Sequence, residues 1–181
     1  MNVELLTEGN DLNVEEGQIG KAMQSAIFPG IAQCFAIAGR RQSFMICTHV
    51  TPGSSAQDIT DTFELMRELG GTWVSSWHVV GPFSEHFNTS TAQWTSVQDI
   101  RDTFSTAFSG ASADHWILDV TTQRNRQVLE PGFTIPTKTN YLDIKAERDA
   151  TGSGVRFSYK GDRGAYRNKW HNLFSGSFSR F

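Results

Sequence analysis

The sequence predicts a single α+β domain with largely antiparallel or mixed β-sheets, a sandwich-like core and two flanking amphipathic helices. Three observations support this fold class. Short runs rich in β-branched and aromatic residues alternate with turn signals, two segments have the apolar spacing of helices, and strands and helices are intermixed without a regular strand–helix–strand repeat. The chain has 181 residues and no long polar linker, so we expect one domain over residues 1–181.

Two amphipathic helices are predicted, at about residues 55–69 and 96–109. Apolar residues recur on one face of each segment at spacings of three or four, and glycine follows each segment. Each segment opens with a capping-box-like pair, Ser55 with Asp58 and Ser96 with Asp99. We therefore expect each helix to pack one apolar face against the sheet.

Six runs of the sequence predict strands. Four of them are short and rich in β-branched and aromatic residues, at 35–38, 43–50, 72–80 and 115–120. Two further runs, beginning at Leu142 and Val155, alternate apolar and polar residues around a glycine-rich turn at 151–154, which predicts a hairpin with one buried face. From about residue 165 the sequence predicts a weakly ordered tail.

Charge and composition argue against two classes of partner. The net charge is −3 and the pI is near 5.9, so the chain lacks the clustered excess of Lys and Arg that nucleic-acid binding needs. The first residues lack the basic flank and apolar run of a signal peptide, and no later stretch approaches the length of a membrane span. We expect a soluble cytoplasmic protein, or one exported without a classical signal peptide, for example by a bacterial injection system.

A cysteine and a histidine are predicted to meet on one face of a hairpin. Cys47 and His49 share a face of the strand at 43–50, because side chains alternate in direction along a strand. The preceding strand reaches this one through a polar turn at 39–42. Any even-length loop between the two strands places Cys34 on the same face as His49, so the sequence predicts a Cys34–His49 pair.

Two registers of this hairpin would place Cys34 and His49 on one face of the sheet. The first pairs Gly39 with Phe44 and places Cys34 directly opposite His49. The second pairs residues 38 and 43 and places Cys34 opposite Cys47, diagonal to His49. Opposed Cβ atoms lie about 4.5–5.5 Å apart and diagonal ones roughly 7–8 Å apart, so a thiol and an imidazole can approach each other in either register.

A cysteine next to a histidine suits nucleophilic catalysis, because the thiolate attacks the substrate and the imidazole takes up the thiol proton. The loop before Cys34 contains Pro29 and Gly30. Gly30 and Gln33 are candidates for positioning the nucleophile or for presenting backbone N–H groups to an oxyanion. The alternative interpretation is that Cys34 and Cys47 are small buried hydrophobic residues of a non-catalytic domain.

Three segments follow one another within residues 17–83: GIAQCFAI at 30–37, MICTHVTP at 45–52, and the predicted helix that ends at Gly70 and Gly71. This order resembles the chemoreceptor glutamine deamidase (CheD-like) family. In that family a glycine-containing loop leads to a cysteine at the start of a strand, a second strand ends in a histidine followed closely by proline, and an amphipathic helix ends at glycine. Cytotoxic-necrotizing-factor-like bacterial toxins, which deamidate host proteins, use a similar cysteine–histidine arrangement.

The resemblance implies a cysteine-dependent amide hydrolase, a protein-glutamine deamidase that works through a thioester and needs no cofactor. Cys34 would be the nucleophile, and His49 would be the base that later protonates the departing ammonia. The substrate would be a glutamine of a partner protein, either chemoreceptor-like or the target of a bacterial toxin or effector. Two alternatives remain: another thiol hydrolase or transferase acting through the same pair, and a non-catalytic binding or inhibitor module with structural thiols.

No third catalytic residue follows from the resemblance. Phe28 stands where the family has a hydroxyl residue that orients the histidine. The remaining candidates are a backbone carbonyl, Gln33, Ser25 and Thr48, although Thr48 should point away from the histidine on the predicted strand.

Two further residues, Cys47 and His78, are predicted to line a pocket around the pair. We expect no metal, because Cys47, His49 and Cys34 supply three ligands and a structural zinc site generally needs four. A nucleotide cofactor is not expected either, because the sequence contains no glycine-rich phosphate-binding loop of either common pattern.

Overall fold

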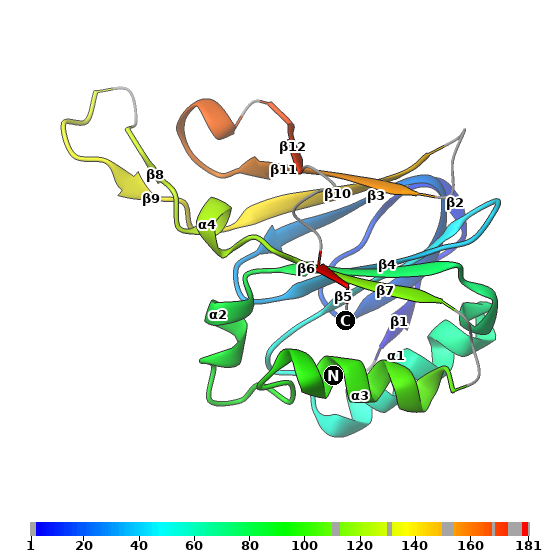
Figure 1. Cartoon of the computed structure of the whole chain (residues 1–181). Coiled ribbons are helices and arrows are strands. Elements are labelled where there is room, and N and C mark those ends of the chain that lie inside the picture. Colours follow the sequence, from blue (N-terminus) through cyan, green and yellow to red (C-terminus); the bar gives the residue numbers. More distant parts are fainter. Residues whose placement is uncertain are drawn as a thin grey trace.

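The computed structural model describes residues 3–109, 113–129, 132–149, 154–167, 169–173 and 179–180. In this described part, 11 strands form one sheet in the order β12-β11-β10-β3-β5-β4-β6-β7-β13, with β1 and β2 also paired to β3 (Figure 1). Strands β8 and β9 form a separate two-stranded sheet. The strands are β1 (Glu4–Leu5), β2 (Gly9–Asn13), β3 (Gln18–Ile31), β4 (Phe35–Arg40), β5 (Met45–Val50), β6 (Ser76–Gly81), β7 (Asp114–Asp119), β8 (Gln127–Val128), β9 (Thr137–Lys138), β10 (Leu142–Arg148), β11 (Val155–Gly161), β12 (His171–Leu173) and β13 (Ser179–Arg180).

Both predicted helices are present, with the predicted caps. The helices are α1 (Ala56–Glu68), α2 (Phe83–Phe87), α3 (Val97–Ala107) and α4 (Thr121–Arg124), with 3-10 turns at η1 (Gly71–Trp73) and η2 (Gly164–Tyr166). Ser55 caps α1 and Ser96 caps α3, each in a complete capping box with the aspartate three residues later. None of the described helices has the length and apolar character that crossing a membrane requires.

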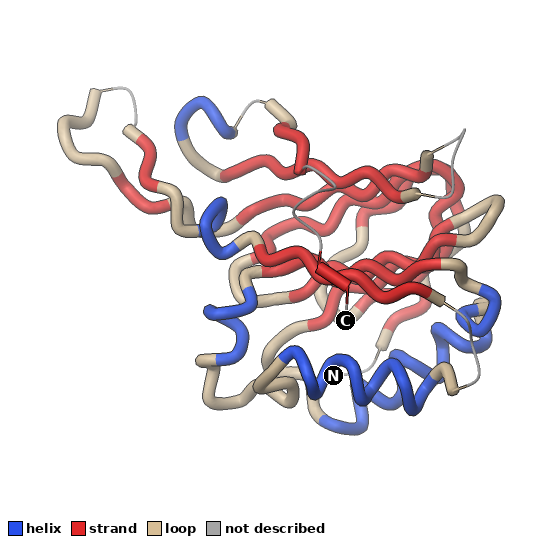
Figure 2. Tube along the Cα trace, viewed as in Figure 1, coloured by secondary structure: helices blue, strands red, loops and turns tan. Residues whose placement is uncertain are grey.

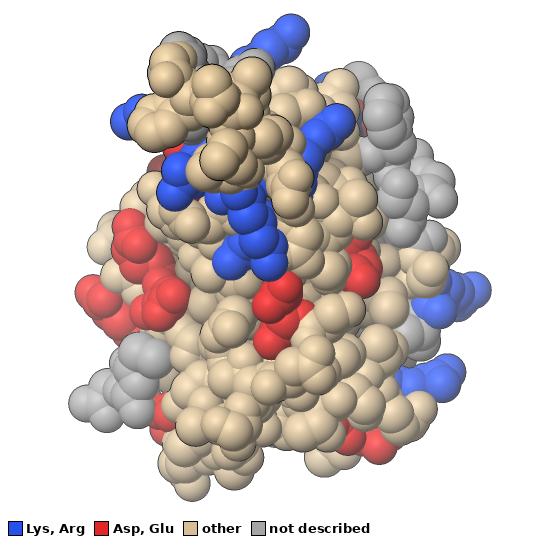
Figure 3. All heavy atoms as spheres, turned by 90° about the vertical axis from the view of Figure 1, so that its left-hand side faces the viewer, with Lys and Arg blue, Asp and Glu red and all other residues tan. Residues whose placement is uncertain are grey.

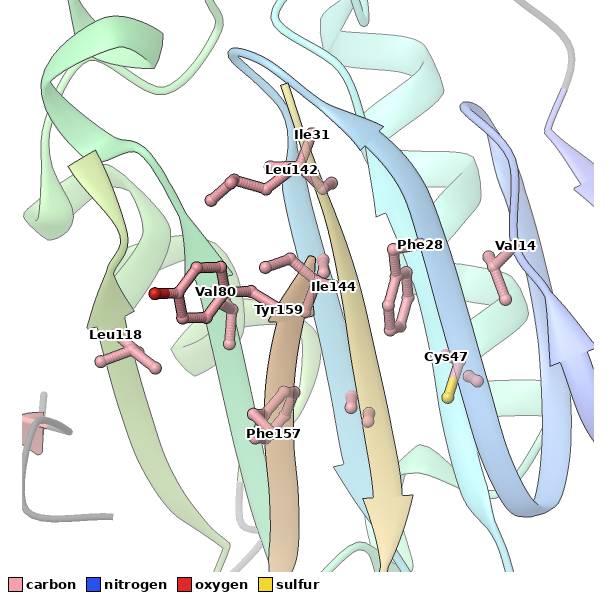
Figure 4. Packing of buried hydrophobic residues seen from close by; sticks show 14 of the residues in the cluster. Val14, Phe28, Ile31, Cys47, Val80, Leu118, Leu142, Ile144, Phe157 and Tyr159 are labelled. Atoms are coloured by element: carbon pink, nitrogen blue, oxygen red, sulfur yellow. The ribbon is translucent and has the colours of Figure 1, made fainter. Parts of the chain in front are cut away.

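Two apolar cores lie on opposite faces of the central strands. The sheet curls so that β10 and β11 lie over β4 and β6, while α1 and α3 lie beneath those strands (Figures 1 and 2). The first core fills the space inside the curl, where Phe28, Ile144 and Phe157 meet Val80 and Leu118 (Figure 4). The second core packs the other face of the sheet against the apolar faces of the helices. The structure thus confirms the predicted α+β class, with mixed strand directions.

Strand β3 is the element that joins the two halves of the sheet. It is 14 residues long, a length that no strand predicted from the sequence approaches. Its first part pairs with β5 and its last part pairs with β10, both antiparallel, while β1 and β2 pair with it in parallel. Because β3 changes partners along its length, it carries the chain from the helix-covered part of the sheet to the β10–β12 part. The sequence analysis did not predict this strand.

The hairpin of β4 and β5 has a register different from both predicted ones. Arg40 pairs with Met45 and Ala36 pairs with His49, which shifts the ladder by two residues. The turn is shorter than expected, because the Arg41 N–H donates to the Phe44 carbonyl at 2.9 Å. The loop is nevertheless even in length. Both predicted registers are therefore wrong, whereas the predicted common face for Cys34 and His49 is correct.

The C-terminal third contains the predicted hairpin, with β10 and β11 paired over seven residue pairs. Its turn at 150–153 lies outside the described residues. A weakly ordered tail was expected from about residue 165. Two described parts of that segment form strands, since β12 pairs with β11 and β13 pairs with β7; residues 168, 174–178 and 181 lie outside the described part.

Basic side chains gather on the side where the β8–β9 hairpin projects, with acidic side chains in separate groups below them (Figure 3). Several of the basic groups near this hairpin have partners. Lys138 lies 3.4 Å from the Glu85 carboxylate, Arg163 donates to the Thr137 hydroxyl, and the Arg126 guanidinium lies over the Tyr166 ring. These contacts hold the three basic side chains against neighbouring residues of the protein surface. The net charge of the whole chain is −3.

Candidate functional site

Cys34 lies in the short connection between β3 and β4, immediately before Phe35 begins the strand. Gly30 lies near the end of β3, where the register with β10 shifts, and its φ of 70° lies in the left-handed region that favours glycine. The Cys34 side chain is only 4% exposed and belongs to the core inside the curl of the sheet. The chain therefore places this thiol at the edge of the core, at the entrance to a central strand.

His49 lies near the end of β5 and is fully buried. Its Nδ1 is 3.1 Å from the backbone carbonyl of Val14. Because a carbonyl oxygen can only accept a hydrogen bond, Nδ1 carries the proton and donates it, which leaves Nε2 with a free lone pair. Among the described residues this Nε2 atom has no hydrogen-bond partner.

The Phe28 ring packs against the His49 ring. Its centroid lies 6.4 Å from that of the His49 ring, at an interplanar angle of 80°. Phe28 and Val14 lie at the same end of the core cluster, next to Cys47 (Figure 4). Phe28 thus contacts the histidine edge-on, while the polar contact that fixes the tautomer comes from a backbone carbonyl, one of the groups left open by the sequence analysis.

The structure brings Cys34 and His49 together and adds Glu16 to them. The Cys34 sulfur, a ring nitrogen of His49 and a carboxylate oxygen of Glu16 all lie within 4.8 Å of one another. The three residues come from three places in the sequence: the connection between β2 and β3, the connection before β4, and strand β5. We call them the Glu16–Cys34–His49 group.

Glu16 holds the thiol in its protonated form. The Cys34 S–H donates to Glu16 Oε1 at 3.3 Å. Burial, followed by the charge of Glu16 and this hydrogen bond, raises the pKa of the Cys34 thiol to about 12. The backbone N–H groups of Gln33 and Ala32 act in the opposite direction and lower this pKa.

Burial also lowers the pKa of His49, and the Val14 hydrogen bond and the nearby charges of Glu16 and Glu15 only partly oppose that effect. At neutral pH the resting pair therefore consists of a neutral thiol and a neutral imidazole. Burial is the larger cause of the raised thiol pKa, so a thiolate forms when the proton moves to His49 Nε2, and loss of the Glu16 charge favours it.

Replacing Glu16 with glutamine is expected to make Cys34 more reactive. The change removes a negative charge next to the sulfur, so the thiol pKa falls, and each unit of that fall raises the thiolate fraction tenfold at neutral pH. We expect iodoacetamide to label Cys34 roughly three to ten times faster in Glu16→Gln than in the wild type at pH 7, measured by intact-mass spectrometry. The control Glu15→Gln removes the neighbouring charge and should have a smaller effect; equal rates in all three proteins would contradict the role of Glu16.

The two predicted positioning residues, Gln33 and Gly30, have different surroundings. The Gly30 N–H donates to Asp143 Oδ1 at 3.1 Å, so a carboxylate engages this amide where the register of β3 with β10 shifts. The Gln33 side chain is exposed, but its backbone N–H faces the Cys34 sulfur and its carbonyl accepts a hydrogen bond from His86 Nδ1 at 2.6 Å. The backbone of Gln33 is therefore the part of this residue that belongs to the site.

His86 in helix α2 anchors the connection that carries Cys34. Besides its bond to the Gln33 carbonyl, its ring stacks on Phe35 with a centroid distance of 4.0 Å and an interplanar angle of 27°. No periodicity or motif signals this role, because the contact joins residues that lie 53 positions apart.

Gly81, at the end of β6, lets that strand approach Cys34. A Cβ atom at this position would lie 2.3 Å from Phe35 Cδ1 and 2.7 Å from the Cys34 carbonyl oxygen. Backbone and a buried ring cannot yield easily, so the absence of a side chain here fixes how closely β6 packs against Cys34.

Replacing Gly81 with alanine is expected to lower the free energy of unfolding by about 1–3 kcal/mol, because the added methyl overpacks the core beside Cys34. Urea denaturation followed by tryptophan fluorescence measures this change. Gly154→Ala is the matched control, since a Cβ at Gly154 meets no atom within 4 Å; it should change stability by less than about 0.5 kcal/mol. Equal stability of the two variants would show that the close contact at Gly81 is not a constraint.

Of the two residues predicted to line a pocket, Cys47 shares the face of His49 but is completely buried in the core cluster. Burial raises the pKa of its thiol.

His78 lies opposite Ala38 in the ladder, four residues beyond Cys34 and thus about 13 Å along the strand, and its ring packs against Phe157. Burial lowers the pKa of His78 to about 4. The structure does not bring His78 to the Glu16–Cys34–His49 group.

A cavity of about 510 Å³ adjoins the group and is lined by Glu15, Glu16, Pro29, Gly30, Tyr141 and Asp143. Glu16 both lines this cavity and binds the Cys34 sulfur, so its carboxylate lies between the open space and the thiol. A larger cavity of about 610 Å³ lies between α1 and α3 and contains none of the three residues of the group. The smaller of these two cavities is therefore the one that touches the group, through Glu16, while neither Cys34 nor His49 lines it.

Comparison with known protein families gives no matching family, and comparison with curated proteins gives no matching sequence.

Proposed function

We propose that this protein is a cysteine-dependent amide hydrolase that deamidates glutamine side chains of a partner protein, with Cys34 as nucleophile and His49 as base. The observation that carries the proposal is the hydrogen bond from His49 Nδ1 to the Val14 carbonyl, 3.1 Å long. It leaves Nε2 free to accept a proton in a group where a ring nitrogen and the Cys34 sulfur lie within 4.8 Å. A nucleophile, a base and a group that orients the base are the parts of an activated thiol, and their nearness within this group supports the proposal.

Each step of the reaction has a group to perform it. The thiol proton moves to His49 Nε2 as the sulfur attacks the carboxamide carbon, and the resulting imidazolium then protonates the departing nitrogen, releasing ammonia and leaving a thioester. Water next attacks the thioester, with His49 again taking the proton. Glutamate forms and the Cys34 thiol is restored, so one water is consumed and one ammonia is released for each glutamine.

The negative oxygen of the tetrahedral intermediate needs N–H donors. The backbone N–H groups of Ala32 and Gln33 face the Cys34 sulfur, the position from which attack occurs. Donors held rigidly at such a position stabilise the charge as it develops. We therefore assign the oxyanion contact to the backbone of Ala32 and Gln33 and limit Gly30 to shaping the end of β3.

The buried thiol favours a long, neutral carboxamide as substrate. Cys34 is 4% exposed and is screened by Glu16, so the reacting group has to enter past a carboxylate. A glutamine side chain carries its uncharged amide on a flexible apolar stem and can reach inward while the rest of the partner protein stays outside. The resemblance to CheD-like deamidases and to the related bacterial toxins supports the same substrate.

Incubation of the purified protein with bacterial and animal cell extracts tests the proposal. We expect ammonia release, together with a gain of about one dalton on particular glutamine-containing peptides. Transfer of an amine in place of water would identify a thiol transferase instead. Absence of any modification that depends on Cys34 would favour a binding or inhibitor module with structural thiols.

A further inference from the structure

The Glu16–Cys34–His49 group has the composition of a transition-metal site. Within the described part of the chain it is the one cluster of three such side chains whose ligand atoms all lie within 4.8 Å of one another. It combines a sulfur, an imidazole nitrogen and a carboxylate oxygen. Zn²⁺ accepts all three kinds of donor, whereas Ca²⁺ and Mg²⁺ prefer oxygen donors throughout.

One distance within the group already approaches the spacing of ligand atoms in a tetrahedral zinc site. With metal–ligand bonds of about 2.0–2.3 Å, neighbouring ligand atoms in a tetrahedron lie about 3.3–3.8 Å apart. The Cys34 sulfur and Glu16 Oε1 are already 3.3 Å apart. Glu16 is exposed, so its side chain can adjust toward the remaining ligand.

His49 supplies an independent observation in favour of a ligand. The residue is 0% exposed, yet its Nε2 atom has no hydrogen-bond partner among the described residues. A buried polar atom without a partner is costly unless something else binds it. The other ring nitrogen donates to the Val14 carbonyl, the arrangement by which metal-binding histidines fix their tautomer and orientation.

We propose that Glu16, Cys34 and His49 bind one Zn²⁺ ion reversibly, with the fourth coordination position open toward the cavity that Glu16 lines. Binding releases the Cys34 proton to solvent and forms a zinc–sulfur bond, while His49 Nε2 donates its lone pair to the metal. Three protein ligands with one open position differ from the four-ligand structural site considered in the sequence analysis, which lacked Glu16.

Metal binding and catalysis exclude each other at this site. The ion occupies the sulfur and the nitrogen that the proposed deamidation uses, so Zn²⁺ inhibits the reaction and its removal restores it. This inhibition rests on the proposed function, whereas metal binding itself does not.

Cobalt substitution tests the site without any substrate. We expect one Co²⁺ per chain, with a near-ultraviolet thiolate-to-cobalt charge-transfer band that is absent in Cys34→Ser and retained in Cys47→Ser. Calorimetry with Zn²⁺ on the full chain should show affinity at least roughly tenfold weaker in Glu16→Gln, because loss of even an outer partner of a metal ligand costs about 10–100-fold. Glu15→Gln is the matched control and should keep the wild-type affinity.

A missing charge-transfer band, or equal affinities of Glu16→Gln and Glu15→Gln, would overturn the metal site. Ammonia release measured with a chelator and with Zn²⁺ separates the two proposals. Zinc binding without ammonia release under chelation would leave the metal site in place and remove the deamidase. Deamidation that is unaffected by Zn²⁺ would leave the deamidase in place and remove the metal site.

Discussion

Replacing Cys34 with serine is expected to lower the rate of glutamine deamidation by at least about 10³-fold, because a hydroxyl is a far poorer nucleophile and the thioester cannot form. Ammonia release and the mass gain of glutamine-containing peptides both measure this loss. The fold should be preserved, since serine is close to cysteine in size and Cys34 lies in a connection before β4. Circular dichroism and urea denaturation check that preservation.

The second cysteine provides a matched control. Cys47 is also a buried thiol of the same core cluster, and among the residues that the structure describes no hydrogen bond or charge activates it; it lies two residues before His49 on β5. Cys47→Ala should retain deamidation. If Cys47→Ala abolished the activity while Cys34→Ser kept it, the assignment of the nucleophile would be wrong.

Replacing His49 with glutamine is expected to lower deamidation by about 10²–10⁴-fold, the usual contribution of a positioned general base. Glutamine retains an N–H that can donate to the Val14 carbonyl but has no basic lone pair to accept the thiol proton. The Glu16→Gln variant, which keeps His49, provides the comparison for a polar change at the same site. A His49→Gln protein with near wild-type activity would require a different base.

The pH profile of deamidation by the wild-type protein gives a second measure of the proposed role of His49. The base has to be neutral, and burial lowers the pKa of His49 below its ordinary value of 6.5. Activity should therefore be retained as the pH falls through 6.5 and be lost only when His49 becomes protonated at a lower pH. An acidic limb centred above 6.5 would indicate a preformed thiolate–imidazolium pair instead.

Local patterns were sufficient to predict both long helices and the face shared by Cys34 and His49. The capping boxes at Ser55 and Ser96 depend on residues three positions apart, which a sequence displays directly. The common face of the cysteine and the histidine depends only on an even loop length. It was therefore predicted correctly although the ladder is shifted by two residues.

The long strand β3 and the residues beside it were beyond prediction from local patterns. Strand β3 contains Gly20, Pro29 and Gly30, which lower strand propensity, and it gains stability from partners far away in the sequence. Glu16 and Val14 reach the site only because β3 and β5 pair. The Val14 contribution is a backbone carbonyl, which any residue would supply, so no side chain signals it. Glu16 carries one weak signal, its position in an acidic pair directly before Gly17, whose φ of 77° forms a turn.

The most direct test of the proposed chemistry is peptide mapping of protein extracts treated with the wild-type protein in heavy-oxygen water. We expect particular glutamines to become glutamates that carry one heavy oxygen, because water hydrolyses a thioester on Cys34, and we expect none of these conversions with Cys34→Ser. Conversion of the same glutamines by Cys34→Ser, or no conversion by the metal-free wild-type protein, would contradict a Cys34–His49 deamidase.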